Sequence, residues 1–256
     1  MNYRGCVMSH GGRVRTNNED NAYLDGYYRS DVRIFEWYRY CEAHDSVLGA
    51  VFDGMGGERD GEIASRMAAE FMWRMKRWRF SEIVEDYTID TNEEIALYNR
   101  AGNMGTTFVA LSVENDHYRF YNLGDSRGYL YRDGLLTQMT EDHTLVRRML
   151  KNQKITEEQA ARHPARHALV QYLGMKEDGE VIRPECDLTV PPEPCRPGDL
   201  FLLCSDGLTE MLPDQKIAEI LKKQIAVQDK TQLLQDEALA AGGKDNVTVL
   251  LLECID

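Results

Sequence analysis

The sequence predicts an α+β fold in which short strands build a sheet sandwich and helices pack on it. Short apolar runs, bounded by glycine and polar turns, recur along the 256 residues, and such runs are typical of buried strands. Apolar side chains also recur at helical spacing between residues 58 and 78. A chain of this length can bury a large core, so we expect a single domain over residues 1–256.

The charge balance is acidic, with 30 Lys and Arg against 43 Asp and Glu, for a net charge of −13. This balance argues against nucleic acid or an anionic membrane as the main partner. Excess carboxylate suits a cation-binding protein, although solvated acidic faces are common. The six cysteines form no CxxC pair, and neither an apolar leader nor an apolar run of about 18 residues occurs. We therefore expect reduced thiols in a cytoplasmic protein.

The first half of the chain alternates predicted strands with polar turns. We expect three strands there, at residues 3–8, 22–24 and 48–52. A β-hairpin extension is expected between residues 25 and 48. Its six aromatic residues are interpreted as cover for a sheet face, with a partner-docking patch as the alternative. A long helix over residues 58–78 and a second helix through residues 92–98 follow.

The next segment returns to strands and then changes to short helices. Strands are expected at residues 108–113 and 118–122, followed by a hairpin with Asp125 at its tip and a turn at Asp133-Gly134. Between residues 141 and 172 the expected helices are 144–151 and 156–162. The second has a capping box and ends at His163-Pro164. This helical excursion is either an ordinary connection or a lid.

The last segment begins with an extended surface crossing. Five of the seven prolines lie between residues 184 and 197, which favours extended backbone. A strand at 200–204, helices at 215–224 and 231–241, and a closing strand at 247–252 complete the chain.

The strand at residues 48–52 organises the rest, because it ends in Asp53. Three glycines lie among the next four residues, so the backbone can approach a ligand and the carboxylate can project beyond the strand. Four more aspartates stand at predicted strand ends or in adjacent turns: Asp20, Asp125, Asp206 and Asp245. Gathered at one edge of a sandwich, these carboxylates would repel one another. Mg²⁺ or Mn²⁺ would relieve that repulsion. Two ions roughly 3.5–4 Å apart would activate a water and clamp a phosphoryl group, whose oxygens Arg15 could hold.

The same residues carry a resemblance to a known family. Six separated motifs resemble, in order, those of metal-dependent type 2C serine/threonine protein phosphatases: Arg15 with Asn18 to Asn21, Asp53 to Gly57, Gly105 to Thr107, Leu123 to Arg127, Ser205 to Gly207, and Lys244 to Thr248. The match covers nearly the whole chain. The segment from Ile155 to Ala160, with His163-Pro164 and Arg166, further resembles the flap of the bacterial branch.

The resemblance implies an α-β-β-α sandwich with a dinuclear Mn²⁺ or Mg²⁺ centre between the sheets. Asp53 would bridge both ions, Gly54 would offer its carbonyl, and Asp206 and Asp245 would bind one ion. Glu19 or Asp20 would complete the shell of the other.

The resemblance also implies a third, weaker ion held by Asp125, a phosphate-binding role for Arg15, and a flap at about residues 141–172. The implied function is hydrolysis of phosphoserine and phosphothreonine in proteins by a metal-activated water. We expect a monomer that acts opposite a Ser/Thr kinase and binds neither nucleic acid nor membrane.

Two departures from the family pattern stand out. Many eukaryotic members have a histidine, the proposed general acid, where this chain has Met55; methionine is common in the bacterial branch, so the proton donor stays open. Residues 25–48 are longer and more aromatic than the usual segment, and residues 79–92 are shorter.

Two other functions are alternatives. A catalytically silent phosphoprotein adaptor is disfavoured by the metal-type carboxylates, and a metal-dependent nuclease by the acidic surface.

Overall fold

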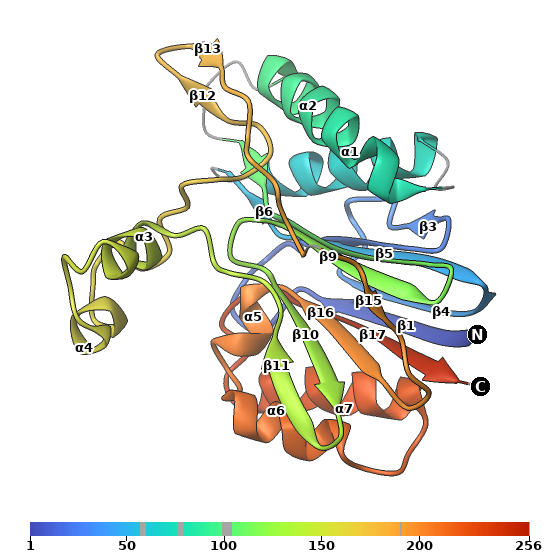
Figure 1. Cartoon of the computed structure of the whole chain (residues 1–256). Helices are drawn as coiled ribbons and strands as arrows, with labels where there is room; N and C mark the ends of the chain where they lie inside the picture. The colour runs from blue at the N-terminus through green and yellow to red at the C-terminus, as the bar shows by residue number, and fades with distance from the viewer. Residues whose placement is uncertain (57–59, 76–78, 99–103, 190, 256) are drawn as a thin grey trace.

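Two stacked β-sheets form the centre of the molecule, and helices cover the outer face of each sheet (Figure 1). The computed structural model describes residues 1–56, 60–75, 79–98, 104–189 and 191–255. The expected α+β class and the α-β-β-α layering are confirmed. Among the helices of the described residues, none is long and apolar enough to cross a membrane.

The first sheet has six strands in the order β11-β10-β16-β17-β1-β4, with antiparallel neighbours throughout. Its strands are β1 (Asn2–His10), β4 (Glu36–His44), β10 (Arg127–Arg132), β11 (Leu135–Gln138), β16 (Leu200–Cys204) and β17 (Val247–Ile255). The strands expected at 3–8, 200–204 and 247–252 are confirmed. The turn between β10 and β11 is confirmed too, since Asp133 and Gly134 have positive φ angles of 53° and 82°, as a type I′ hairpin turn requires.

The second sheet follows the order β14-β9-β8-β5-β2-β3, with β15 also paired to β9. Its strands are β2 (Asn21–Leu24), β3 (Tyr27–Tyr28), β5 (Ser46–Phe52), β8 (Phe108–Glu114), β9 (His117–Leu123), β14 (Asp187–Leu188) and β15 (Glu193–Pro194). The four strands expected in this sheet are confirmed. The proline-rich crossing runs along the β9 edge, where β14 and β15 are only two residues each.

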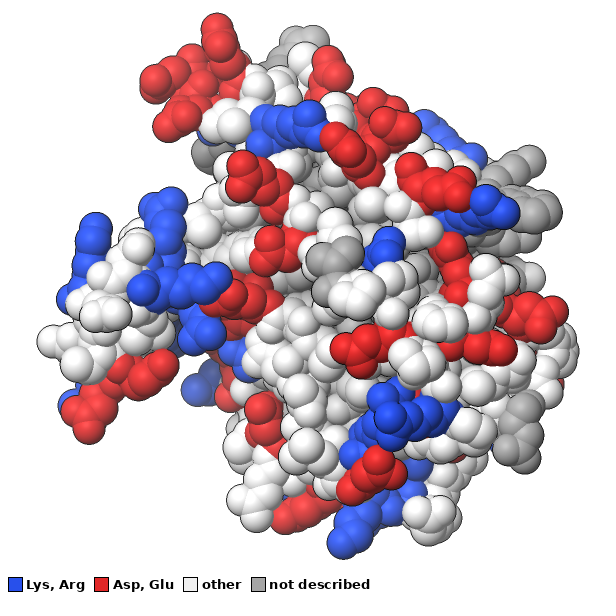
Figure 2. Space-filling view, in the orientation of Figure 1, with Lys and Arg blue, Asp and Glu red and all other residues white. Residues whose placement is uncertain are grey.

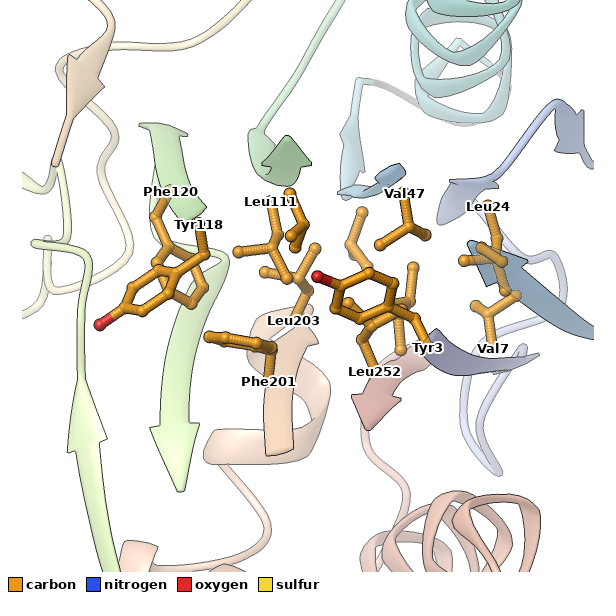
Figure 3. Close-up of a cluster of buried hydrophobic side chains, with 14 of the residues drawn as sticks. Tyr3, Val7, Leu24, Val47, Leu111, Tyr118, Phe120, Phe201, Leu203 and Leu252 are labelled. Atoms are coloured by element: carbon orange, nitrogen blue, oxygen red, sulfur yellow. The ribbon is translucent and has the colours of Figure 1, made fainter. Parts of the chain in front are cut away.

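A hydrophobic core fills the space between the sheets (Figure 3). Alternate residues of each strand point inward, so Tyr3 and Val7 of β1 enter this core while Cys6 and Met8 face the helices on the other side. Figure 3 shows side chains from both sheets pointing toward one another, among them Tyr118 and Phe201, whose ring centroids are 4.8 Å apart. This packing fixes the distance between the two sheets, and with it the spacing of the loops at their ends.

Two helices cover the second sheet, and three cover the first (Figure 1). The helices on the second sheet are α1 (Gly61–Arg74) and α2 (Phe80–Tyr98); those on the first are α5 (Asp206–Thr209), α6 (Asp214–Leu221) and α7 (Val227–Ala240). The helices expected near residues 58–78, 215–224 and 231–241 are confirmed within these bounds, while residues 57–59 and 76–78 lie outside the described part of the chain. Helix α2 begins at Phe80, well before the expected residue 92. Residues 81–91 are rich in acidic side chains, but Phe80, Val84 and Tyr87 form a buried apolar face that extends the helix toward its N-terminus.

A projecting arm carries the two short helices α3 (Leu145–Lys151) and α4 (Glu157–Ala161) (Figure 1). Thr144 caps α3, and Thr156 forms the expected capping box with Gln159 at the start of α4. Beyond the arm, β12 (Lys176–Glu177) pairs with β13 (Glu180–Val181) beside α2. A last small ladder joins β6 (Gly54–Met55) to β7 (Gly105–Thr106).

Two hairpin predictions were wrong, for the same physical reason. Strand β3 does form a hairpin with β2, but β4 pairs with β1 in the other sheet. Likewise β9 and β10 belong to different sheets, so Asp125 lies in a loop that crosses between the sheets and not at a hairpin tip. Local alternation identifies a strand, but packing of the whole chain selects its partner. The aromatic side chains between residues 25 and 48 have different surroundings. Trp37 packs on the core between the sheets, Tyr40 packs on the core between the first sheet and its helices, and Tyr38 is 53% exposed.

Candidate metal centre

The backbone of Asp53, directly after β5, is held by Thr106 at the end of β7 and by Thr107, the next residue. Its N–H donates to Thr107 Oγ1 at 2.9 Å, and its carbonyl accepts from Thr107 N and Thr106 Oγ1, both at 2.9 Å. These contacts use only the backbone of Asp53, so its carboxylate remains available to the other carboxylates of the site. The Gly-Thr-Thr motif therefore acts through the backbone of Asp53.

Gly54 lies between two other segments of the site. A Cβ at this position would come within 2.1 Å of the Gly61 carbonyl oxygen and 2.5 Å of the Glu19 carbonyl oxygen. The Gly54 N–H donates to that same Glu19 oxygen at 3.2 Å. Only glycine fits there, and its presence brings β5, the start of α1 and the Glu19 segment into contact.

Asp20 is buried, with 1% of its surface exposed. Its Oδ2 accepts hydrogen bonds from Ser205 and Thr248, both at 2.7 Å. Its Oδ1 is also buried but has no hydrogen-bond partner among the described residues. Burial raises the pKa of Asp20 to about 7, against the opposing effect of those two hydroxyls.

Asp206 begins α5, directly after Ser205 at the end of β16, and its carboxyl group interacts with that of Asp53. Burial and then the charge of Asp245 raise the pKa of Asp206 to about 6. Burial, followed by the charges of Asp20 and Asp206, raises the pKa of Asp53 well above its usual value.

Asp125 belongs to the same group of charges. Burial and then Asp206 raise its pKa well above the usual range. Four aspartates thus share one buried region, and the charge of at least one neighbouring aspartate makes ionisation of each less favourable.

Asp245 and Arg15 form the exposed side of the site. Arg15 Nη2 donates to Asp245 Oδ2 at 2.6 Å, and their side chains are 50% and 30% exposed. That hydrogen bond raises the pKa of Arg15, with further contributions from Glu19 and Asp53. A half-exposed guanidinium beside the carboxylates can be reached by an anion from solution.

Glu19 lies near Arg15 and Asp245. Its Oε1 accepts from Asn17 Nδ2 at 3.2 Å, and its carboxyl group lies against Gly61 at the start of α1. Burial raises its pKa, and the nearby Glu62 adds to the effect. Asp20 and Glu19 therefore have different partners, although they are neighbours in sequence.

The arrangement fits a divalent cation. Five aspartates from five segments converge, Arg15 is a cation at the rim, and the buried Asp20 Oδ1 lacks a donor among the described residues. Hard divalent ions prefer carboxylate oxygens, and such an ion would satisfy Oδ1 and offset the mutual repulsion.

The comparison with protein families decides what kind of site this is. A model of the protein phosphatase 2C family matches residues 37–241. The chain belongs to this family. Membership confirms the expected family and the expected enzyme class, and it favours a catalytic protein over a silent phosphoprotein adaptor.

Relatives of this phosphatase match over most of its length. The serine/threonine phosphatase stp of Listeria monocytogenes serotype 4b is 37% identical over 254 residues, covering 94% of this chain and 92% of that protein. The solved serine/threonine phosphatase of S. agalactiae has a TM-score of 0.83 at 29% identity, covering 99% of this chain and 100% of that one. The catalytic domain of PstP, solved in complex with two manganese ions, has a TM-score of 0.76 at 30% identity. That match covers 100% of both chains.

His167 lies beside two of the candidate ligands, a position that the sequence did not predict. One ligand atom each from Asp125, His167 and Asp206 lie within 4.8 Å of one another. His167 belongs to the arm, is 46% exposed and contacts Glu210 at 3.1 Å. A single histidine 42 residues after Asp125 and 39 residues before Asp206 gives no spacing signal, so only the fold could reveal it.

Three further residues of the family motifs form hydrogen bonds with the candidate ligands, a role that the sequence did not predict. Ser205 and Thr248 are the donors to Asp20. Asn246 accepts from the Glu19 N–H at 2.7 Å and donates to the Gly11 and Asn17 carbonyls, both at 2.9 Å. The motif pattern indicated their positions, but their contacts with residues about 200 positions away depend on strand pairing.

Proposed function

We propose that this phosphatase hydrolyses phosphoserine and phosphothreonine in proteins with two Mn²⁺ or Mg²⁺ ions held by its aspartate cluster. The observation that carries the proposal is the buried Asp20 Oδ1, which has no hydrogen-bond partner among the described residues and belongs to a group of five aspartates. When bound, the ions would supply a water of lowered pKa and neutralise charge on the phosphoryl group.

The proposed ligands are divided between the two ions. Asp53 would bridge them and Gly54 would offer its carbonyl, while Asp206 and Asp245 would bind one ion. Glu19 and Asp20 would complete the other shell, directly or through water.

Arg15 would bind the phosphate oxygens, exchanging its ion pair with Asp245 for a pair with substrate. Ser205 and Thr248 would hold Asp20 in one orientation by their hydrogen bonds.

A third, weaker ion would lie between Asp125 and Asp206. The proximity of His167 supports this, because an imidazole nitrogen is a further possible ligand within 4.8 Å of both carboxylates. Met55 carries no proton to donate, so the proton for the leaving serine or threonine oxygen would come from this region.

Several finer expectations belong to the same proposal. Residues 1–256 would act as one catalytic domain with the arm at 141–172 as its flap, as a monomer, in the cytoplasm and opposite a Ser/Thr kinase. All six cysteines are free in the structure, which supports a reducing compartment.

The direct test measures phosphate release from a phosphothreonine peptide with added Mn²⁺, with an EDTA-treated sample as the control. We expect release only with the metal. Peptide binding without release would favour the silent adaptor, and hydrolysis of a phosphodiester in preference to the peptide would favour the nuclease.

A further inference from the structure

The arm at residues 141–172 differs in charge from the rest of this acidic protein. It contains six basic and four acidic residues, whereas the whole chain has a net charge of −13. Figure 2 shows blue side chains gathered on the arm, while red side chains are spread over the body. The arm therefore presents a positively charged surface that would attract an acidic partner and orient it.

Two of the six cations already share an ion pair with one carboxylate. Glu141 accepts from Arg147 Nε at 2.8 Å and from Lys151 Nζ at 2.5 Å. The other four, Arg148, Lys154, Arg162 and Arg166, are exposed and make no ion pair with any residue that the structure describes. We call these four residues the arm cations. Their charge is available to a partner.

The base of the arm fixes where these cations stand. Leu145 N donates to the Ala168 carbonyl at 2.8 Å, and Val170 N donates to the His143 carbonyl at 2.8 Å. His143 N in turn donates to the Gly124 carbonyl at 2.9 Å, directly before Asp125. The two legs of the arm are therefore joined to each other and to the loop that carries a proposed metal ligand.

His167 shows how closely the arm approaches the metal centre. It immediately follows Arg166 and lies within 4.8 Å of the Asp125 and Asp206 carboxylates, measured between ligand atoms. A peptide whose phosphorylated residue reaches the aspartate cluster would therefore bind close to this part of the arm. The residues that flank the phosphorylated position are thus the ones that would meet the arm cations.

We propose that the arm cations dock acidic residues flanking the phosphorylated residue of the protein substrate. The proposal rests on the proposed function, since it places the phosphoryl group at the aspartate cluster. Asp and Glu side chains pair with exposed guanidinium and ammonium groups, and the acidic body of the protein would repel the same peptide in other orientations. The arm thereby selects substrates by the charge of their flanking sequence.

The test compares two phosphothreonine peptides of equal length, one with three aspartates on each side of the phosphothreonine and one with asparagines there. We expect kcat/KM with Mn²⁺ to be about tenfold higher for the acidic peptide, which corresponds to about 1.4 kcal/mol. In the Arg148→Glu/Arg162→Glu variant the ratio should fall to about one or below. Raising the salt concentration should also reduce the ratio, because exposed charges are screened.

A matched control separates docking from a general effect of charge. Lys222→Glu/Lys223→Glu makes the same change in net charge at exposed positions, also at the end of a helix but on α6. It should keep the tenfold ratio. Turnover of p-nitrophenyl phosphate, which has no flanking residues, should be unchanged in both variants and reports that the site is folded.

Equal kcat/KM for the two peptides in the wild type would overturn the docking proposal, as would an equal loss of preference in the α6 variant. Failure to hydrolyse either peptide would overturn the proposed function instead. In that case fluorescence anisotropy with the same two peptides still decides the docking proposal, because equal dissociation constants would exclude it.

Discussion

The Arg29 guanidinium donates to the main-chain carbonyl of Asp20 at 2.5 Å, so a buried cation lies directly behind a buried carboxylate residue. The same group donates to the Asn18 carbonyl at 2.8 Å and the Ile34 carbonyl at 2.5 Å. Arg29 thus joins the segment that carries Asp20 to the long, aromatic insertion that follows it. This buried arginine had no role in the sequence interpretation.

We expect Arg29→Met to weaken Mn²⁺ binding as well as the fold. Each buried carbonyl left without a donor costs roughly 1–3 kcal/mol, so the free energy of unfolding should fall by about 3 kcal/mol or more. Calorimetry would measure the Mn²⁺ dissociation constant, and thermal unfolding the stability. Arg33→Met, which removes an exposed arginine paired with Asp31, is the control. Loss of stability with unchanged Mn²⁺ affinity would mean that Arg29 does not position Asp20.

Asp53→Asn should abolish activity while the fold survives. The substitution removes one charge from the centre of the aspartate cluster, so both ions would be held poorly. Because the ionised Asp53 is destabilised by burial and by its neighbours, the metal-free variant should unfold at the same or a higher temperature than wild type. Substantial turnover by a folded, metal-loaded variant would exclude the bridging role of Asp53.

Arg15→Ala should raise KM for phosphopeptides by about tenfold or more, with a smaller effect on kcat. A hydrogen bond to a charged group contributes roughly 1.5–3 kcal/mol, and a guanidinium that mainly grips the ground-state phosphate affects KM. Arg13→Ala, two residues away and also exposed, is the matched control. A loss confined to kcat would show that Arg15 acts only in the transition state.

The raised pKa values predict how the metal-free protein responds to pH. The pKa of Asp20 is raised from 3.8 to about 7 and that of Asp206 to about 6. The folded state therefore holds protons that the unfolded state releases near pH 4. Stability from these groups is fully present below that pH and is lost as the pH rises to about 7, by about 1.4 kcal/mol per pH unit for each proton.

Comparison with Asp20→Asn isolates this effect from other titrating groups. In EDTA, the stability of the variant relative to wild type should increase between pH 4.5 and pH 7.5. Stabilisation of wild type by Mn²⁺ should also grow over this range, because the ligands must lose their protons to bind. A difference between variant and wild type that does not change with pH would contradict the assigned environment of Asp20.

Asp125→Ala should slow hydrolysis of a phosphothreonine peptide far more than hydrolysis of p-nitrophenyl phosphate at saturating metal. A threonine alkoxide is a poor leaving group and needs a proton, whereas p-nitrophenolate leaves without one. His167→Asn, compared on the same two substrates, tests the neighbouring imidazole. If only Asp125→Ala slows the peptide selectively, the proton donor is held by the Asp125 carboxylate. If both variants do so, Asp125 and His167 hold the proton donor together. Equal losses on both substrates would show that Asp125 supports the fold or the two main ions.

The strands and the candidate ligands could be predicted from the sequence because both are local signals. A short, continuous apolar run marks β5, which is buried from Val47 to Phe52, and the glycines after it mark Asp53 as a residue at the end of a strand. The same reasoning found Asp206 after β16 and Asp245 before β17. These positions depend on the backbone conformation of a few neighbouring residues, which the sequence by itself determines.

Tertiary structure decided which of these residues meet. Ser205 and Thr248 lie 185 and 228 residues from Asp20 in sequence, yet both donate to its carboxylate. The pairing of β4 with β1 and the crossing at Asp125 likewise depend on how the two sheets stack, which no short stretch specifies. Arg29 reaches the site because the aromatic insertion packs beside it, and His167 reaches it because the arm does. Convergence of distant side chains is set by the burial of the whole core, so it could be seen only in the folded chain.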